Sequence, residues 1–287
     1  MTLRILPLLA IAAVLGCGPH RVSSLQWMTM GTVAKVSFKG GGTFAGLAPE
    51  KTLPSVDRRH VDVVRCVYGE VERKLSIWDK NSEISNFKDI NGVSPEMRPC
   101  YEAAFRLQKT SGGVFNPYWR GAGKGPDLGG IAKGFAVDLA AAKVALERKV
   151  GASGVSDMLL DLGGNLKVVS GVWRTGIRNP SGDMPEIVLT NGMACATSGE
   201  YERGKHIYDG RTGKVVSNNL VSVTVVHPHS AMIADGLSTT LFILGKNEGE
   251  RFLREHYPEA TAYWIETPNF GKTANSISEY CLIRFDL

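Results

Sequence analysis

A glycine pair that leads directly into a long apolar helix constrains the fold of this chain more than any other feature. In Asp127-Leu-Gly-Gly-Ile-Ala-Lys-Gly134 an acidic residue precedes two glycines, and an Ala/Leu-rich segment follows to about Lys149. Glycines permit a tight turn, and the composition and spacing that follow predict a helix. The first turn of such a helix presents unpaired N–H groups and the positive end of the helix dipole, so the junction suits a phosphate.

Two side chains would extend this phosphate site. Lys133 adds a positive charge in the first turn, and Asp127 could hold a sugar hydroxyl or orient a base. The alternative is that Gly129 and Gly130 only close a strand-to-helix turn, because a glycine pair with a lysine is weak evidence by itself. The stretch alone leaves both interpretations open.

The hydrophobic periodicity predicts an α+β fold. Helical spacing occurs over residues 56–77, 94–109, 230–244 and 247–256. Strand-like segments occur at 33–36, 158–161, 166–169, 173–177, 186–190, 194–197, 221–226, 261–265 and 281–285, with the four between 166 and 197 expected as a β-meander. Strands in series and helices in blocks favour mixed or antiparallel sheets with packed helices in a single domain.

Composition excludes several classes of protein. A chain of 287 residues with 43% hydrophobic content can bury a large core, and its 33 glycines show no period, which excludes a collagen-like chain. The net charge of +5 is dispersed without a basic run. We therefore expect no nucleic-acid partner.

The N-terminus predicts export and a lipid anchor. Arg4 precedes an apolar run over residues 5–15, which suits a signal peptide and is shorter than the ~20 residues of a transmembrane helix. Val14-Leu15-Gly16-Cys17 resembles a bacterial lipobox, so residues 1–16 would be a signal peptide and Cys17 the lipidated first residue. Residues 17–28 would tether a domain over 29–287 to the periplasmic side of the inner membrane. One alternative is an ordinary cleaved signal, which would give a secreted or periplasmic protein. The other is a buried N-terminal segment.

The spacing of the other four cysteines differs from that of a structural zinc site. Cys66, Cys100, Cys195 and Cys281 contain no CxxC pair, which argues against structural zinc. In an oxidising compartment they could form disulfides, and we expect Cys66 with Cys100 because both fall in helical segments. Buried free thiols are the alternative.

Two further polar clusters could carry chemistry. Asp235 and Thr239 lie four residues apart on one helix face, where a carboxylate and a hydroxyl suit Mg²⁺. The alternative is that Asp235 caps a helix or pairs with a lysine, and that Thr239 bonds back to its own helix. His206 lies in a polar run and could act as a general base oriented by Asp209, because imidazole titrates near neutral pH. An exposed loop histidine is the alternative.

Eight motifs in order resemble the ApbE-type FAD:protein FMN transferases, which are periplasmic flavin transferases. They are Met30-Gly-Thr, Leu75-Ser-Ile-Trp-Asp with Ser82-Glu-Ile-Ser-x-Phe, Gly113-Val-Phe-Asn-Pro, DLGGIAKG, Asp161-Leu-Gly-Gly-Asn, ATSGEY, HIYDGRTG and SAMIADGLSTT. Each motif alone is weak evidence, but together they span nearly the whole chain from about residue 27 to 249.

The resemblance implies a role for each matching residue. Met30 and Trp78 would sandwich the isoalloxazine ring, and Asp127 and Lys133 would contact the FAD. The other residues on the flavin side would be Val114, Phe115, Asn116 and Ile207. Mg²⁺ would be held by the backbone carbonyl of Gly130 and the side chains of Asp235 and Thr239.

The implied reaction moves FMN from FAD to a protein. A Thr or Ser hydroxyl of an acceptor flavoprotein subunit, deprotonated by His206 or Asp209, would attack the FMN phosphorus and release AMP. The alternatives are a Mg²⁺-dependent FAD pyrophosphatase and a non-catalytic FAD-binding lipoprotein.

The chain departs from the family pattern at four places. Trp78 stands where a tyrosine is more usual, and a short Tyr-Trp-Arg-Gly link at 118–121 stands where relatives usually carry a long helical insertion. Gly210 replaces a proline, which we expect to loosen its loop, and residues 40–54 have no counterpart.

Overall fold

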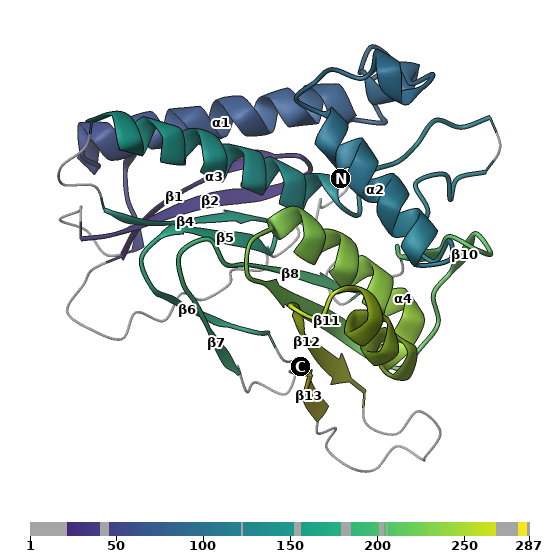
Figure 1. The fold of residues 1–287 in the computed structure, drawn as a ribbon. Helices are drawn as coiled ribbons and strands as arrows, with labels where there is room; N and C mark the ends of the chain where they lie inside the picture. The colour runs from purple at the N-terminus through teal and green to yellow at the C-terminus, as the bar shows by residue number, and fades with distance from the viewer. Residues whose placement is uncertain are drawn as a thin grey trace, which may run out of the picture.

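One large mixed sheet forms the centre of the protein (Figure 1). The computed structural model describes residues 22–40, 46–121, 123–151, 156–178, 185–200, 204, 206–267 and 281–285. Within these ranges nine strands pair in the order β13-β12-β11-β8-β5-β4-β2-β1-β3. Neighbours are antiparallel except β1 and β3, which are parallel.

The strands of this sheet are β1 (Val22–Thr29), β2 (Thr32–Lys39), β3 (Gly46–Leu47), β4 (Asp157–Leu162), β5 (Asn165–Ser170), β8 (Ala194–Gly199), β11 (Leu220–His227), β12 (Thr261–Glu266) and β13 (Cys281–Phe285). Two separate ribbons pair β6 (Trp173–Gly176) with β7 (Glu186–Leu189), and β9 (Tyr208–Asp209) with β10 (Lys214–Val215).

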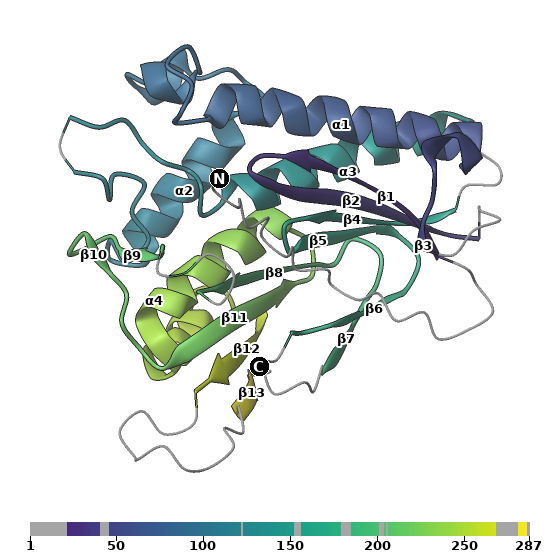
Figure 2. The same ribbon diagram turned by 180° about the vertical axis from the view of Figure 1, so that it is seen from behind.

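Helices cover one face of the sheet. They are α1 (Ser55–Leu75), α2 (Arg98–Thr110), α3 (Ala132–Gly151) and α4 (Ala231–His256), with short 3₁₀ turns at η1 (Glu50–Thr52), η2 (Ile84–Asn86) and η3 (Ile90–Gly92). Helices α1, α3 and α4 lie over the sheet, while the β6–β7 ribbon lies on its opposite side (Figure 2). The predicted α+β fold is confirmed. None of the helices in the described ranges is long and apolar enough to span a membrane.

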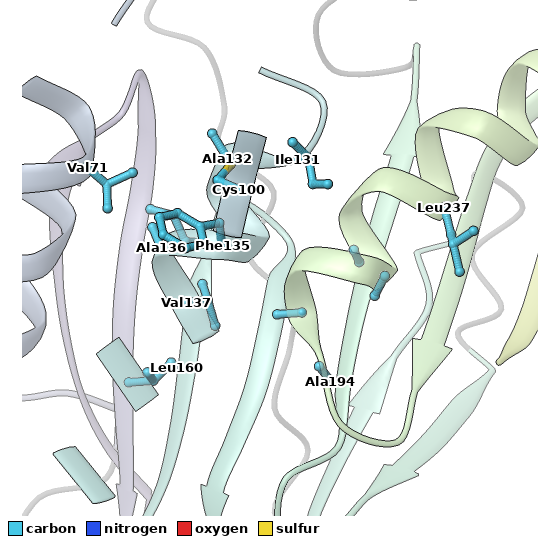
Figure 3. Packing of buried hydrophobic residues seen from close by; sticks show 14 of the residues in the cluster. Val71, Cys100, Ile131, Ala132, Phe135, Ala136, Val137, Leu160, Ala194 and Leu237 are labelled. Atoms are coloured by element: carbon cyan, nitrogen blue, oxygen red, sulfur yellow. The ribbon is translucent and has the colours of Figure 1, made fainter. Parts of the chain in front are cut away.

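The main core fills the space between the helices and the sheet. Val71 of α1, Phe135 and Ala136 of α3, and Leu237 of α4 are buried there with Leu160 of β4 (Figure 3). Burying a large apolar side chain such as Phe135 or Leu237 contributes roughly 1.5–3 kcal/mol to the stability of the fold. This packing sets the distance between α3 and α4, the two helices that carry the glycine turn and the Asp235/Thr239 pair.

The two helices predicted at 230–244 and 247–256 are both present, and α4 joins them across a kink. Gly245 breaks α4 with a φ of 73°, a left-handed value that favours glycine. The kink turns the polar second half of α4 away from the direction of its apolar first half.

Two sequence-based expectations were wrong. The tether predicted over 17–28 includes residues 22–28 of β1, because the β1–β2 register buries Ser23, Ser24 and Leu25. The meander is interrupted, since β5 pairs with β8 while Trp173 and Leu189 carry β6–β7 onto the outer face of the sheet. The predicted signal peptide and Cys17 lie outside the described residues.

The expected Cys66–Cys100 disulfide does not form. Both cysteines are free, as is Cys195. Cys66 is exposed on α1, whereas Cys100 is buried on α2, so the two thiols face different environments. Cys100 and Cys195 are buried free thiols, as the alternative interpretation predicted.

A buried histidine makes the stability of the fold depend on pH. His60 and Asp57, one helical turn apart in α1, are 2% and 0% exposed. Burial, followed by the nearby Arg148 and Arg59 charges, lowers the pKa of His60 from 6.5 to about 4. The unfolded chain therefore binds a proton at His60 more readily than the folded protein does, and acid favours unfolding between these two values.

We expect His60 to lower the free energy of unfolding by about 2 kcal/mol between pH 7.5 and pH 5. Asp57, whose pKa burial raises, acts in the opposite direction at lower pH. Chemical unfolding at a series of pH values should show a shallower pH dependence in His60→Leu than in the wild type. His229→Ala, an exposed site, is the control. Equal slopes in wild type and His60→Leu would contradict this assignment.

Candidate active site

One cavity of about 590 Å³ gathers segments from both ends of the chain. It is lined by the β1–β2 hairpin, the end of α1 and the loop after it, the start of α3, and α4. The structure brings these predicted site residues together on its walls: Met30, Trp78, Val114, Phe115, Asn116, Asp127, Gly130, Lys133, His206, Ile207, Asp235 and Thr239. Asp209 is not one of the lining residues.

The β1–β2 hairpin holds Met30 at the cavity in a strained conformation. Met30 and Gly31 form a two-residue turn with φ values of 48° and 67°, as a type I′ turn requires. Met30 is the only non-glycine residue in the described ranges with a positive φ, which costs roughly 1–2 kcal/mol. Thr29 anchors the hairpin by donating to Glu72 of α1 at 2.8 Å.

Trp78 offers an open aromatic surface on the same cavity. Its side chain is 91% exposed on the loop that follows α1. A large apolar face that the protein itself leaves uncovered suits a flat ring, and so does the polarisable sulfur of Met30.

The glycine turn is tied to the first turn of α3. Asp127 Oδ1 accepts from Gly129 N at 2.9 Å, and Lys133 Nζ donates to Gly129 O at 3.2 Å. A Cβ on Gly130 would lie 3.0 Å from Phe115 and 3.5 Å from the hydroxyl of Thr239, so α4 packs directly on this turn. The turn follows the loop after α2 rather than a strand, and it faces the predicted cation residues.

Helices α3 and α4 cap each other with carboxylates. Asp235 of α4 accepts from Gly134 N of α3 at 2.9 Å. Asp138 of α3 accepts from the backbone N–H groups of Ala231 and Met232 at the start of α4, at 2.9 and 3.0 Å. It also accepts from the Ser230 hydroxyl and pairs with Lys167 at 2.7 and 2.8 Å. The two helices can approach this closely because a Cβ on Gly134 would lie 2.2 Å from Ala231 O.

Burial and nearby charge have opposite effects on the pKa of Asp235. Its side chain is 5% exposed, and this burial raises the pKa of the carboxyl. Lys133, whose Nζ lies 3.7 Å from Oδ1, and the Gly134 N–H act against that rise. Asp235 therefore does what the alternative interpretation predicted: its carboxylate caps a helix and pairs with a lysine. Thr239 instead shares a hydrogen bond of 3.1 Å with the Ser198 hydroxyl.

The oxygen atoms near Asp235 suit a hard cation. No group of three His, Cys, Asp or Glu side chains within the described ranges could hold a metal. A cation here would therefore use the Asp235 carboxylate, the Thr239 hydroxyl, a backbone carbonyl of the glycine turn and oxygens from a ligand. That set matches Mg²⁺, which binds few protein carboxylates and completes its shell with phosphate and water.

His206 presents one free ring nitrogen. Its Nδ1 lies 2.7 Å from the carbonyl oxygen of Gly204, and a carbonyl only accepts, so Nδ1 carries the proton. In the neutral ring Nε2 is then the basic nitrogen. Asp209 does not orient this ring. Its carboxylate binds Arg211 at 2.7 and 3.0 Å, and that hydrogen bond lowers its pKa.

The expectation that Gly210 loosens its loop was wrong. Gly210 N donates to Val114 O at 3.0 Å, and Gly210 O accepts from Asn116 Nδ2 at 2.9 Å. A Cβ on Gly210 would lie 2.3 Å from the Cβ of Asn116 and 2.6 Å from Gly113 O. Glycine thus allows two loops to dock closely.

Sequence reasoning missed Trp119 and Tyr208. Both line the cavity, and their rings stack with centroids 4.3 Å apart. The signal that could have found Trp119 is the short link at 118–121, which contains two adjacent aromatic residues, Tyr118 and Trp119.

The ApbE family profile matches residues 119–264, which is just over half of the chain. This chain belongs to the ApbE family. A Vibrio cholerae protein named FAD:protein FMN transferase is 28% identical over 313 aligned residues, which cover 84% of this chain and 88% of that protein. A Haemophilus influenzae protein of the same name is 27% identical, and the alignment covers 79% of this chain and 82% of that protein.

Solved structures of ApbE proteins have the same fold. The flavin transferase ApbE from Vibrio cholerae superposes with a TM-score of 0.67 at 21% identity, over 93% of this chain and 97% of that one. The ApbE protein from Thermotoga maritima superposes with a TM-score of 0.66 at 23% identity, over 86% of this chain and 94% of that one. At these identities the likeness shows the fold, and it confirms the ApbE-like architecture expected from the motifs.

We expect the loss of the Asp138 carboxylate to loosen α4 from α3. Asp138→Ala leaves the start of α4 without its acceptor and should lower the free energy of unfolding by about 2–4 kcal/mol. Asp89→Ala is the matched control, because exposed Asp89 accepts only from Asn91 N in η3 and should cost about 1 kcal/mol or less. Urea unfolding of both variants measures the difference, and equal losses would contradict the role of Asp138.

Proposed function

We propose that this ApbE-family chain is an FAD:protein FMN transferase. It transfers the FMN part of FAD to a Thr or Ser hydroxyl of an acceptor protein, forms a phosphoester and releases AMP. The observation that carries this proposal is the single cavity in which an open aromatic surface, a helix N-terminus with Lys133, and buried Asp235 meet His206. The names of relatives aligned over most of their length support it.

FAD would lie along the cavity. Met30 and Trp78 would enclose the isoalloxazine ring, and the other lining contacts would come from Val114, Phe115, Asn116 and Ile207. Asp127 and Lys133 would contact the FAD at the glycine turn, where the N–H groups of α3 suit the pyrophosphate.

The residues present fit a Mg²⁺ ion. The Gly130 carbonyl, the Asp235 carboxylate and the Thr239 hydroxyl would hold it, and the ion would neutralise charge on the pyrophosphate. The Lys133 ammonium and the α3 amides add further positive charge on the same side.

His206 would start the chemical step. Its Nε2 takes the proton from the acceptor hydroxyl, and the resulting oxygen attacks the FMN phosphorus. The phosphorus–oxygen bond to the AMP phosphate breaks as the new phosphoester forms, and AMP leaves with the negative charge. Asp209 is held by Arg211, so His206 is the better base of the two.

Mass spectrometry tests this function directly. The purified chain with FAD, Mg²⁺ and a respiratory flavoprotein subunit should produce AMP and an acceptor that gains the mass of FMN. FMN and AMP formed equally with and without acceptor would indicate a pyrophosphatase. Stable bound FAD without any AMP would indicate a flavin-binding protein that is not an enzyme.

Removing the charge of Asp235 should prevent catalysis without unfolding the protein. Asp235→Asn keeps an oxygen acceptor for Gly134 N, so its thermal unfolding should stay close to the wild type. Its transfer rate should fall by ~10²-fold or more and its half-saturating Mg²⁺ concentration should rise. Asp235→Ala should in addition lose about 1–3 kcal/mol of stability because Gly134 N lacks its acceptor. Wild-type transfer by Asp235→Asn at low Mg²⁺ would exclude the proposed cation site.

His206→Ala should slow FMN transfer by ~10²-fold or more, since the acceptor hydroxyl loses its base. The control is His229→Ala, which changes an exposed histidine that does not line the cavity. Single-turnover kinetics with excess enzyme isolate the chemical step. An unchanged rate would assign proton removal to another group.

We further propose that the enzyme works on the periplasmic side of the inner membrane, anchored through a lipid on Cys17. The lipobox-like sequence before Cys17 supports this location. Cys17→Ser should move the protein from the membrane fraction to the soluble fraction after cell lysis. An unchanged distribution would contradict the anchor.

A further inference from the structure

A second aromatic surface lines the cavity apart from Met30 and Trp78. The rings of Trp119 and Tyr208 stack with an interplanar angle of 15° and a centroid distance of 4.3 Å. Both side chains are partly exposed and both line the cavity. A stacked pair has outer ring faces, and these are available to a third flat ring.

The pair is held by the docking of two loops. Gln108 Nε2 donates to Asn116 Oδ1 at 2.8 Å, and Asn116 Nδ2 in turn donates to Gly210 O at 2.9 Å. Gly210 N donates to Val114 O at 3.0 Å. These bonds join the 113–119 loop to the segment that carries Tyr208, so the platform is preformed.

The pair adjoins the glycine turn. Pro117 O accepts from Asp127 N at 2.8 Å, and Arg120 Nε lies 3.8 Å from Asp127 Oδ2. Trp119 lies between these two contacts in sequence. Met30 and Trp78 come from other elements that line the same cavity, the β1–β2 hairpin and the loop after α1.

We propose that Trp119 and Tyr208 form the stacking platform for the adenine ring of FAD. FAD carries two flat ring systems joined through a pyrophosphate, and this cavity has two aromatic surfaces with the glycine turn next to the second. The proposal rests on the proposed function, which places the isoalloxazine ring at Met30 and Trp78. It also gives the short link at 118–121 a role, because that link supplies Trp119.

The platform predicts which dinucleotides the enzyme accepts. Stacking on an aromatic side chain strengthens the binding of a base by roughly 5- to 150-fold and tolerates different bases. A flavin dinucleotide with guanine should therefore replace FAD, while one with the smaller cytosine ring should bind more weakly.

The test compares ligands with and without the adenine ring. Trp119→Leu keeps apolar bulk but removes the flat face, and it should raise the Kd for FAD and for ADP about 10-fold while leaving the Kd for FMN unchanged. Trp119→Phe should restore most of the affinity. The control is Tyr118→Ala, which changes a neighbouring aromatic that stacks on Phe105 and does not line the cavity. Tyr208→Leu provides a second variant if Trp119→Leu unfolds.

Two outcomes would overturn the platform. Equal weakening of FMN and FAD would place the pair at the flavin end. An unchanged Kd for FAD with a raised KM for the acceptor would make it an acceptor surface. Because the readout is binding, a wild-type protein that binds FAD but transfers no FMN would refute only the proposed function. A wild-type protein that does not bind FAD at all would refute both.

Discussion

The exchange of carboxylates between α3 and α4 is the interaction on which the rest of the site depends. Asp138 satisfies the start of α4, and Asp235 satisfies an N–H in the first turn of α3. Each helix N-terminus therefore lies against an acid from the other helix, and Gly134 lets the backbones approach closely. This contact places Asp235 and Thr239 opposite the glycine turn, although about a hundred residues separate the two segments.

Asp235 stabilises the fold and, in the proposed function, also takes part in the chemistry. Its Oδ2 accepts from Gly134 N, whereas Oδ1 faces Lys133 at 3.7 Å. A buried carboxylate that keeps one oxygen available is a costly arrangement unless a charged partner is present. Lys133 supplies that partner in part, and a divalent cation on a bound pyrophosphate would supply the rest.

Close backbone approaches let short segments build the cavity walls. Met30 is placed at the cavity by a two-residue hairpin turn with both φ values positive, and Gly210 lets its loop sit on residues 113–116. The short link at 118–121 supplies Trp119, which lines the cavity and stacks on Tyr208.

The sequence by itself predicted the fold class, the helices and many of the residues that line the cavity. Periodicity and turn-forming glycines are local features, and the motifs keep their order along the chain. The sequence did not determine strand partners: β1 was taken for a tether, and β6–β7 were placed in the wrong sheet. Only the tertiary structure decided that Cys66 and Cys100 face different environments. It also decided that the Asp209 carboxylate pairs with Arg211 and that the ring of Trp119 stacks on that of Tyr208. These outcomes depend on which surfaces pack against each other. Residue spacing indicates which face of an element is buried, but not which other segment covers that face.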